Sequence, residues 1–376
     1  MKDGIYLDPT ITQPSAASIE AILPFYKEFW GSPLALHQKG QELWGPIYQA
    51  TTWIYEALGI DFQDHFTLTN SGAEAIASVF FSTYIDFMRE TGQNHFLIMP
   101  TEDPAMLHAI KRLEALDCVG KWLPLDECGR LRPEALEEAI KPRVALLSLS
   151  WANGLTGVIQ PIDDLTRVCQ KKGIKIHVDA SHVIGKLFFR FADAGIDYLT
   201  LEGSRFHCPQ GVGALVCQKA TPLQSLLGSY DMNPASLTAL AVNMREAQEN
   251  FDLMCTETAR LRDKLEEGIR QTVKDAHLLF QAADRLPNVT VAAFPGIASE
   301  AMLYALNRRG VYASIGGGNS QKLQYILQAC GTAPTLATTS ISFSLSSKTQ
   351  EEEIDRTIAI IEDTVHQLRT FSKDLS

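Results

Sequence analysis

A carboxylate and a guanidinium follow two consecutive predicted strands in the middle of the chain. Residues 174–178 form a short apolar run that ends at Asp179, and residues 197–202 form a second run that leads into Gly203-Ser204-Arg205. Open α/β sheets bind ligands at the carboxyl ends of their strands. The pattern therefore predicts that Asp179 and Arg205 meet at one sheet edge, where they could hold a charged ligand. The alternative is that Asp179 only closes a turn, since Asp commonly follows strands.

A second polar turn joins a predicted strand at 66–69 to a helix that continues to about Glu90. The turn is Ser71-Gly72-Ala73-Glu74. Small residues at a helix start leave backbone N–H groups free at its positive end, which suits a phosphate. A plain tight turn capped by Ser71 is the alternative. His182, three residues after Asp179, is either a ligand contact or a structural histidine.

Strands and helices alternate along the first two thirds of the chain. Further strands are predicted at 95–99, 119–123, 144–149 and 214–218, with helices at 14–30, 34–58, 104–113, 133–140 and 163–172. This alternation indicates right-handed β-α-β crossovers and a largely parallel central sheet flanked by helices. The fold class is therefore α/β.

The pattern changes after Gln218. A short helix is predicted at 222–227 and a long one at 235–271, followed by strands at 289–294, 311–314 and 340–344 and helices at 299–307, 321–330 and 350–371. We expect an N-terminal arm at 1–20, a large domain at 21–250 and a smaller α+β domain at 251–376.

Composition limits the classes of function. The 376 residues are 45% apolar and 20% charged, as in ordinary globular proteins, and the net charge of −11 argues against nucleic-acid or anionic-membrane partners. Seven cysteines without Cys-x-x-Cys spacing predict reduced thiols rather than disulfides or a metal site. The chain shows no signal-peptide pattern and no membrane-spanning run, so we expect a cytoplasmic protein.

The central stretch resembles the class V aminotransferase family, particularly its NifS-like cysteine desulfurases. The residues that carry the resemblance are His177-Val178-Asp179-Ala180-Ser181-His182, Gly185-Lys186 and the Pro209-x-Gly211-x-Gly213-Ala214-Leu215 run. The resemblance implies the pyridoxal phosphate (PLP)-dependent transferase type I fold, with Asp179 on the cofactor's pyridinium nitrogen and Ser71, Gly72, Ala73 and Glu74 around its phosphate. It also places His182 and Ser204 at the cofactor.

The same resemblance shows departures at the positions that do chemistry. The family's cofactor-binding lysine corresponds to Arg205, which cannot form a Schiff base because a guanidinium stays protonated. Asp103 replaces the histidine that stacks on the PLP ring. Further replacements are Glu202 for a phosphate-binding serine, Asn319 for the nucleophilic cysteine and Ser342 for the arginine that clamps the substrate carboxylate.

We therefore expect a pseudoenzyme: a cysteine desulfurase-like protein without desulfurase catalysis, retained as a binding or regulatory partner. The alternative is a lysine-free enzyme that binds PLP or another small phosphate or carboxylate in the same cleft. PLP, if bound, is expected to be held non-covalently. The expected assembly is a homodimer, with a heteromer containing an active paralogue as a further option.

Overall fold

The structure is a computed structural model that describes residues 4–221, 232–318 and 321–374. Its main sheet has seven strands. Its strand order is β2-β8-β7-β6-β5-β3-β4. The strands are β2 (His65–Thr69), β3 (His95–Ile98), β4 (Val119–Trp122), β5 (Val144–Ser150), β6 (Lys175–Asp179), β7 (Tyr198–Glu202) and β8 (Gly213–Cys217). All neighbours are parallel except β8, which is antiparallel to β7 and β2. The expected mostly parallel α/β sheet is confirmed.

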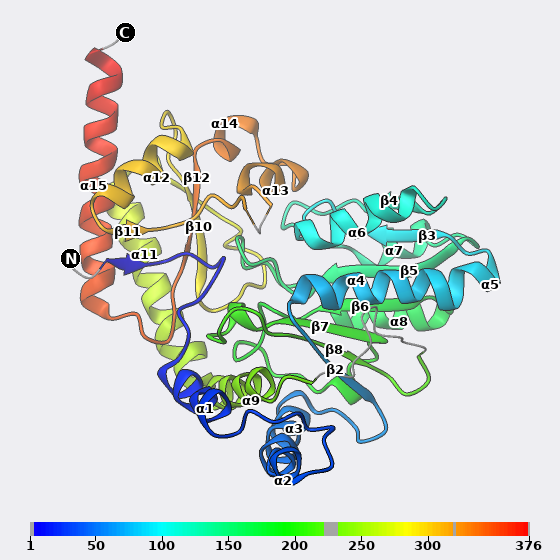
Figure 1. Ribbon diagram of the computed structural model, residues 1–376. Helices are drawn as coiled ribbons and strands as arrows, with labels where there is room; N and C mark the ends of the chain where they lie inside the picture. The colour runs from blue at the N-terminus through cyan, green and yellow to red at the C-terminus, as the bar shows by residue number, and fades with distance from the viewer. Residues whose placement is uncertain (1–3, 222–231, 319–320, 375–376) are drawn as a thin grey trace.

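Helices cover both faces of this sheet (Figure 1). They are α1 (Ala16–Lys27), α2 (Gln38–Gln41), α3 (Trp44–Leu58), α4 (Gly72–Ser82), α5 (Arg89–Thr91), α6 (Pro104–Glu114), α7 (Pro133–Ala139), α8 (Ile162–Lys172) and α9 (Pro234–Glu249). Along β3, Phe96 and Ile98 pack with α4 and α6, whereas Leu97 packs in the cluster that contains α3, α8 and α9. Side chains alternate along a strand, so a strand buried on both faces is apolar throughout.

Local signals explain where the helices end. In α8, Asp163 and Asp164 occupy the first turn and Lys171 and Lys172 the last, which matches the helix dipole. Gly173 then adopts φ +68° as the left-handed C-cap, so the chain can turn directly into β6. This turn sets the position at which β6 ends in Asp179.

The C-terminal part forms a smaller α+β unit. It contains the antiparallel sheet β12-β10-β9, with β9 (His277–Leu279), β10 (Val289–Ala293) and β12 (Ser340–Ser344). Its helices are α10 (Phe251–Leu253), α11 (Ala259–Thr272), α12 (Ser299–Arg308), α13 (Leu323–Ala329), α14 (Pro334–Ala337) and α15 (Glu351–Asp374). Helices α11 and α15 pack against each other at the edge of the molecule farthest from the main sheet (Figure 1). The division into domains at 20 and 250 remains a prediction.

The N-terminal arm lies on its own chain. Strand β1 (Ile5–Tyr6) pairs in parallel with β11 (Val311–Tyr312), and Ile5 and Leu7 are buried in the core of the smaller unit. Figure 1 shows the blue arm running from β11 toward α1 past the centre of the molecule. The arm therefore connects the two parts of the fold.

Two predicted helices are corrected, and one strand was not predicted. The helix expected at 34–58 is two helices, α2 and α3, and the strand β9 was missed. The helix expected at 235–271 is interrupted after α9. There the Asn250 side chain donates to the Glu246 carbonyl, which is also a helical hydrogen-bond acceptor. A π-helical segment, Met254–Thr258, precedes α11. The helix expected at 222–227 lies outside the described residues.

Two negative findings apply to the described part of the chain. None of its helices combines the length and the apolar run that a bilayer crossing needs. Within the same residues, no three His, Cys, Asp or Glu side chains gather as metal ligands would.

Candidate functional site

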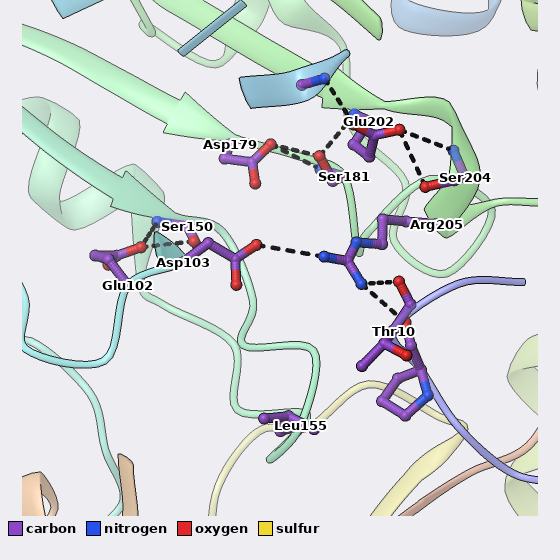
Figure 2. Close-up of polar contacts among 12 residues, drawn as sticks. Thr10, Glu102, Asp103, Ser150, Leu155, Asp179, Ser181, Glu202, Ser204 and Arg205 are labelled. Carbon is purple, nitrogen blue, oxygen red and sulfur yellow. Dashed lines mark hydrogen bonds and ion pairs between the residues drawn. The ribbon is translucent and has the colours of Figure 1, made fainter. Parts of the chain in front are cut away.

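Polar residues end three neighbouring strands at one edge of the sheet. Asp179 ends β6 and Glu202 ends β7, while Ser150 ends β5 opposite Asp179 in the register. Figure 2 shows these three residues along one line of strand ends, with Arg205 facing them from the turn after β7. The parallel arrangement of β5, β6 and β7 is what brings them together.

Asp179 is buried and its carboxylate is held by hydroxyl groups. Its Oδ1 accepts from Ser181 Oγ at 2.6 Å and from Thr200 Oγ1 at 3.2 Å. Burial raises its pKa to about 7; the Ser181 hydrogen bond opposes this rise, Asp103 adds to it and Arg205 reduces it. Asp179 is therefore poised between its charged and neutral forms near neutral pH, and it does not contact Arg205 through a hydrogen bond in the described contacts.

The turn predicted to bind a phosphate binds a carboxylate of the same chain. The Gly72 backbone N–H donates to Glu202 Oε2 at 2.7 Å, and Ser204 Oγ donates to Glu202 Oε1 at 3.0 Å. A Cβ on Gly72 would lie 2.7 Å from the Glu202 Cβ, so only glycine permits this approach. The Gly72 N–H is therefore used by Glu202 in this structure. We call Gly72, Glu202 and Ser204 the cup.

The other residues of this turn serve the helix. Ser71 Oγ accepts from the Glu74 backbone N–H at 3.1 Å as the N-cap of α4, and Glu74 Oε2 accepts from Asn70 N at 2.9 Å. Together they satisfy two donors at the turn, as in a capping box. Ala73 is exposed in the first turn. The capping alternative for Ser71 is what the structure shows.

Arg205 connects the sheet edge to the N-terminal arm. Its side chain is 6% exposed, and its Nη1 donates to the Thr10 carbonyl and, at 3.4 Å, to the Pro9 carbonyl. Its Nη2 lies 3.9 Å from Asp103 Oδ2. Figure 2 shows the guanidinium between Asp103 and Thr10. Sequence reasoning missed this contact with the arm, because the two residues lie far apart in the chain.

Glu102 is a buried residue of the site that sequence reasoning missed. Its Oε2 accepts from Ser150 N at 2.8 Å and Ser150 Oγ at 2.6 Å, and it is 1% exposed. Burial raises its pKa to about 8 against the effect of the Ser150 hydrogen bonds. The sequence carries no signal that one carboxyl group of the acidic pair before Pro104 is buried.

Asp103 occupies the position just before α6 and makes no side-chain cap there. Burial raises its pKa, and Arg205 counteracts the rise. The Asp103 side chain is 27% exposed. A carboxylate offers no flat apolar face, so this position does not provide a ring that could stack on an aromatic ligand.

His182 packs on the loop between β5 and α8. A Cβ on Gly154 would lie 2.2 Å from its ring, so the ring rests directly on that glycine. Burial, with Arg205 and Lys186 nearby, lowers the pKa of His182 well below its usual value, so the ring is neutral. Asn153 Oδ1 accepts from the backbone N–H groups of Leu155 and Thr156 within its own turn.

Ser342 and Asn319 occupy the positions of the family's substrate-clamping arginine and nucleophilic cysteine. Ser342 on β12 is buried and donates to the Leu155 carbonyl at 2.6 Å, which fastens the smaller unit to the loop after β5. Asn319 lies outside the described residues, so its position is not tested.

Two cavities of very different size border the site. The first has a volume of about 10 Å³, the size of one water molecule, and is lined by Pro9, Asp103, Asn153, Gly154, Leu155, His182, Gln321 and Ile326. The second has a volume of about 650 Å³ and lies between the arm, α9 and the loop after β12; Arg205, Lys186 and His182 are on its wall. We call it the arm cavity.

Comparisons with known proteins agree with this geometry. The sequence model of the class V aminotransferases matches residues 5–234. A cysteine desulfurase of Sinorhizobium fredii is 32% identical over 97% of this chain and 97% of its own length. The cysteine desulfurase NifS of Azotobacter vinelandii is 32% identical, with 98% and 94% of the two chains covered.

A solved structure of a NifS-like protein has the same fold. It superposes with a TM-score of 0.90 at 27% identity and covers 96% of this chain and 99% of its own. The match extends over both the main sheet and the smaller unit, so the type I PLP-transferase fold holds along nearly the whole chain. On its family match and its full-length relatives, the chain belongs to the class V aminotransferase family, as a homologue of the NifS-like cysteine desulfurases.

Proposed function

We propose that this protein is a non-catalytic member of its family, whose cleft is closed by its own side chains and which acts as a binding or regulatory partner. The single observation that carries the proposal is the cup. Glu202 places a negatively charged group on the Gly72 N–H, at the turn where the family holds the phosphate of PLP. A second anion would meet the carboxylate at close range, and like charges in a partly buried site repel strongly.

The remaining residues around the cup do not fit PLP either. Arg205 has no free amine for a covalent bond, and its guanidinium is already engaged by the arm. Asp103 offers no ring to stack on. The volume between Asp103, Gly154 and His182 is about 10 Å³, which is far too small for a pyridine ring. We therefore derive no reaction step through PLP in this chain.

The first test is the activity of the relatives. Purified protein, incubated with L-cysteine and PLP, is expected to release sulfide and alanine no faster than PLP alone, with a NifS-type desulfurase assayed in parallel as the positive control. Arg205→Lys should stay at the same rate, because Glu202, Asp103 and Ser342 remain. Robust PLP-dependent production by the unaltered protein would overturn the proposal.

The second test addresses the cup directly. In Glu202→Ser the carboxylate is removed and the Gly72 N–H is released, so inorganic phosphate should raise the melting temperature by about 2 °C or more. The unaltered protein should not respond beyond the effect of sodium chloride at equal ionic strength. Equal stabilisation of both proteins by phosphate would show that Glu202 does not occupy an anion site.

A ligand-binding function without lysine chemistry is the second candidate. The arm cavity of about 650 Å³ favours it, since this is the size of an ordinary small-molecule site. The visible spectrum of the purified protein with and without added PLP, together with a phosphate assay after desalting, separates the candidates. Retained, stoichiometric PLP supports the second one; its removal by desalting supports the first.

We propose a homodimer as the assembly. A heteromer with an active paralogue is the second proposed assembly. The N-terminal arm pairs with its own chain, so it does not by itself call for a partner surface. Support comes from exposed apolar side chains around a groove of about 960 Å³, among them Tyr48, Phe62 and Phe188, which are 76%, 83% and 85% exposed. Light scattering at micromolar concentration tests whether the protein is a dimer. A cytoplasmic location remains a prediction.

A further inference from the structure

Two cysteines lie on neighbouring segments that belong to different units of the fold. All seven cysteines are free thiols in this structure. Cys128 lies in the turn between β4 and α7, and Cys330 is the C-cap residue of α13 in the smaller unit. A Cβ built on Gly129 would lie 3.0 Å from Cys330 Sγ, so this sulfur rests directly against the turn. Consecutive Cα atoms are about 3.8 Å apart, so Cys128 is only one residue from the contact.

Two side chains of the turn also lie near the Cys330 sulfur. Burial raises the pKa of Cys330 to about 12, and the charges of Asp126 and Cys128 add to the rise. Electrostatic effects of this kind weaken with distance, so both groups are close to that sulfur. Asp126, Cys128 and Gly129 are therefore all neighbours of one buried thiol.

The main chain on both sides of this contact is well fixed. Asp126 Oδ1 accepts from the Cys128 backbone N–H at 2.9 Å, which holds the turn together. Gln160 Nε2 donates to the Gly129 carbonyl at 2.9 Å and fastens the turn to the segment before α8. Cys330 N donates to carbonyl groups of the last turn of α13 at 3.1 Å. The two cysteines are thus held in neighbouring places by their own main chain.

The two thiols differ in their access to solvent. Cys128 is partly exposed, whereas Cys330 is 7% exposed. The thiolate is the reactive form of cysteine, and a thiol with a pKa of about 12 stays protonated at neutral pH. A dissolved oxidant therefore meets Cys128 first. Cys330 is placed to react with the modified Cys128 rather than with the oxidant itself.

We propose that Cys128 and Cys330 form a reversible disulfide when the protein meets a low-molecular-weight disulfide such as glutathione disulfide. The Cys128 thiolate attacks one sulfur of the small disulfide and releases its other half as a thiolate. Cys330 then gives up its proton, attacks the Cys128 sulfur and releases the second half. Two protein thiols and one small disulfide give one protein disulfide and two small thiols. Two electrons pass from the protein to the small disulfide.

The new bond would act on the cleft through α13. Ile326, one turn before Cys330 in this helix, lines the cavity of about 10 Å³ beside Asp103. Cys128 belongs to the main-sheet side, so the bond ties the wall of this cavity to that side. It closes a loop of about 200 residues, and stabilisation by a disulfide grows with loop length. The inference goes beyond the proposed function and does not rest on it.

The test uses the full-length protein, reduced and then incubated with excess glutathione disulfide. Remaining thiols are blocked with N-ethylmaleimide, and the peptides are mapped by mass spectrometry without reduction. Cys255, the other partly exposed cysteine, is the internal reference for simple glutathione attachment. The melting temperature is measured before oxidation, after it and after treatment with dithiothreitol.

In the unaltered protein, a peptide that links Cys128 to Cys330 should be the main product, while Cys255 carries glutathione. The melting temperature should rise by about 3 °C or more and return on reduction. Cys330→Ser should leave glutathione on Cys128 without this rise. Cys128→Ser, at a partly exposed position, should give neither the linked peptide nor the rise. Cys255→Ser is the matched control and should behave as the unaltered protein does.

Three results from the unaltered protein would overturn the inference. Glutathione that stays on Cys128 without a linked peptide would show that the two sulfurs do not meet in the folded chain. A link from Cys330 to another cysteine would assign the partner wrongly. A link that leaves the melting temperature unchanged would remove the tie between the two units. None of these results bears on sulfide release from cysteine, which is measured separately.

Discussion

The cup and the arm cavity satisfy their polar groups in opposite ways. In the cup, the Glu202 carboxylate accepts from Gly72 N and Ser204 Oγ, so the turn's N–H is already used. Beside the arm cavity, Asn243 Oδ1 and Asn288 Oδ1 are buried and accept from no donor among the described residues. A cleft can therefore close one subsite with its own side chains and leave the next one open. Loss of the family's lysine does not by itself mean loss of every binding site.

Arg205 follows the cup residue Ser204 in the chain and lies on the wall of the arm cavity. It lines the arm cavity, its guanidinium reaches the arm carbonyls, and it lies near Asp103. The same charge lowers the pKa of Lys186 and limits the rise at Asp103. Changes that remove this charge should consequently affect both regions, whereas changes in the cup or its helix should stay local.

The largest expected effect is that of Arg205→Met. The substitution leaves Asp103 without its nearby cation and the Pro9 and Thr10 carbonyls without their donor, so the free energy of unfolding should fall by about 3 kcal/mol. Urea unfolding measures it. Arg190→Met, at an arginine whose side chain is 60% exposed, is the control and should change stability by less than about 0.5 kcal/mol. Equal losses in the two variants would mean that Arg205 does not hold the arm.

A smaller effect is expected from Glu102→Gln, and it depends on pH. The folded-state pKa of Glu102, about 8, is above its ordinary value of 4.5, so the folded protein keeps a proton that the unfolded chain loses. The stability from this proton is complete below pH 4.5 and is lost as pH rises toward 8. Asp179, with a pKa of about 7, acts in the same direction.

Glu102→Gln removes the first of these titrations. Its stability should decline less than that of the unaltered protein between pH 5 and pH 7, by about 2.5 kcal/mol. Urea unfolding at both pH values measures the difference. Parallel declines in the two proteins would show that Glu102 does not hold a proton in the folded state.

The smallest effect is predicted for Ser71→Ala. If Ser71 caps α4 rather than binding a phosphate, its loss should lower stability by about 1 kcal/mol, whether or not phosphate is present. Ser15→Ala, which removes the N-cap of α1, is the matched control and should lower stability by a similar amount. A stability loss in Ser71→Ala that phosphate changes, while Ser15→Ala stays constant, would return Ser71 to the anion site.

Much of the fold was predictable from local patterns. Apolar runs such as those ending at Asp179 and Glu202 mark strands because parallel strands buried on both faces have no polar side to show. Breaks such as Gly173 mark helix ends because only glycine adopts the left-handed cap without strain. The interruption after α9 was missed because Asn250 is tolerated within a helix unless its side chain turns back to the main chain.

By itself, the sequence determined the order of the elements, the family resemblance and the types of residue at the strand ends, since these depend on residue identity and spacing along the chain. Only the tertiary structure decided what those residues contact. That Glu202 occupies the Gly72 N–H, that Arg205 reaches Thr10 and that the carboxyl group of Glu102 is buried all depend on segments far apart in the chain. The energies of charges and hydrogen bonds are set by such distances and by exclusion of water, and neither is encoded in any local run of residues.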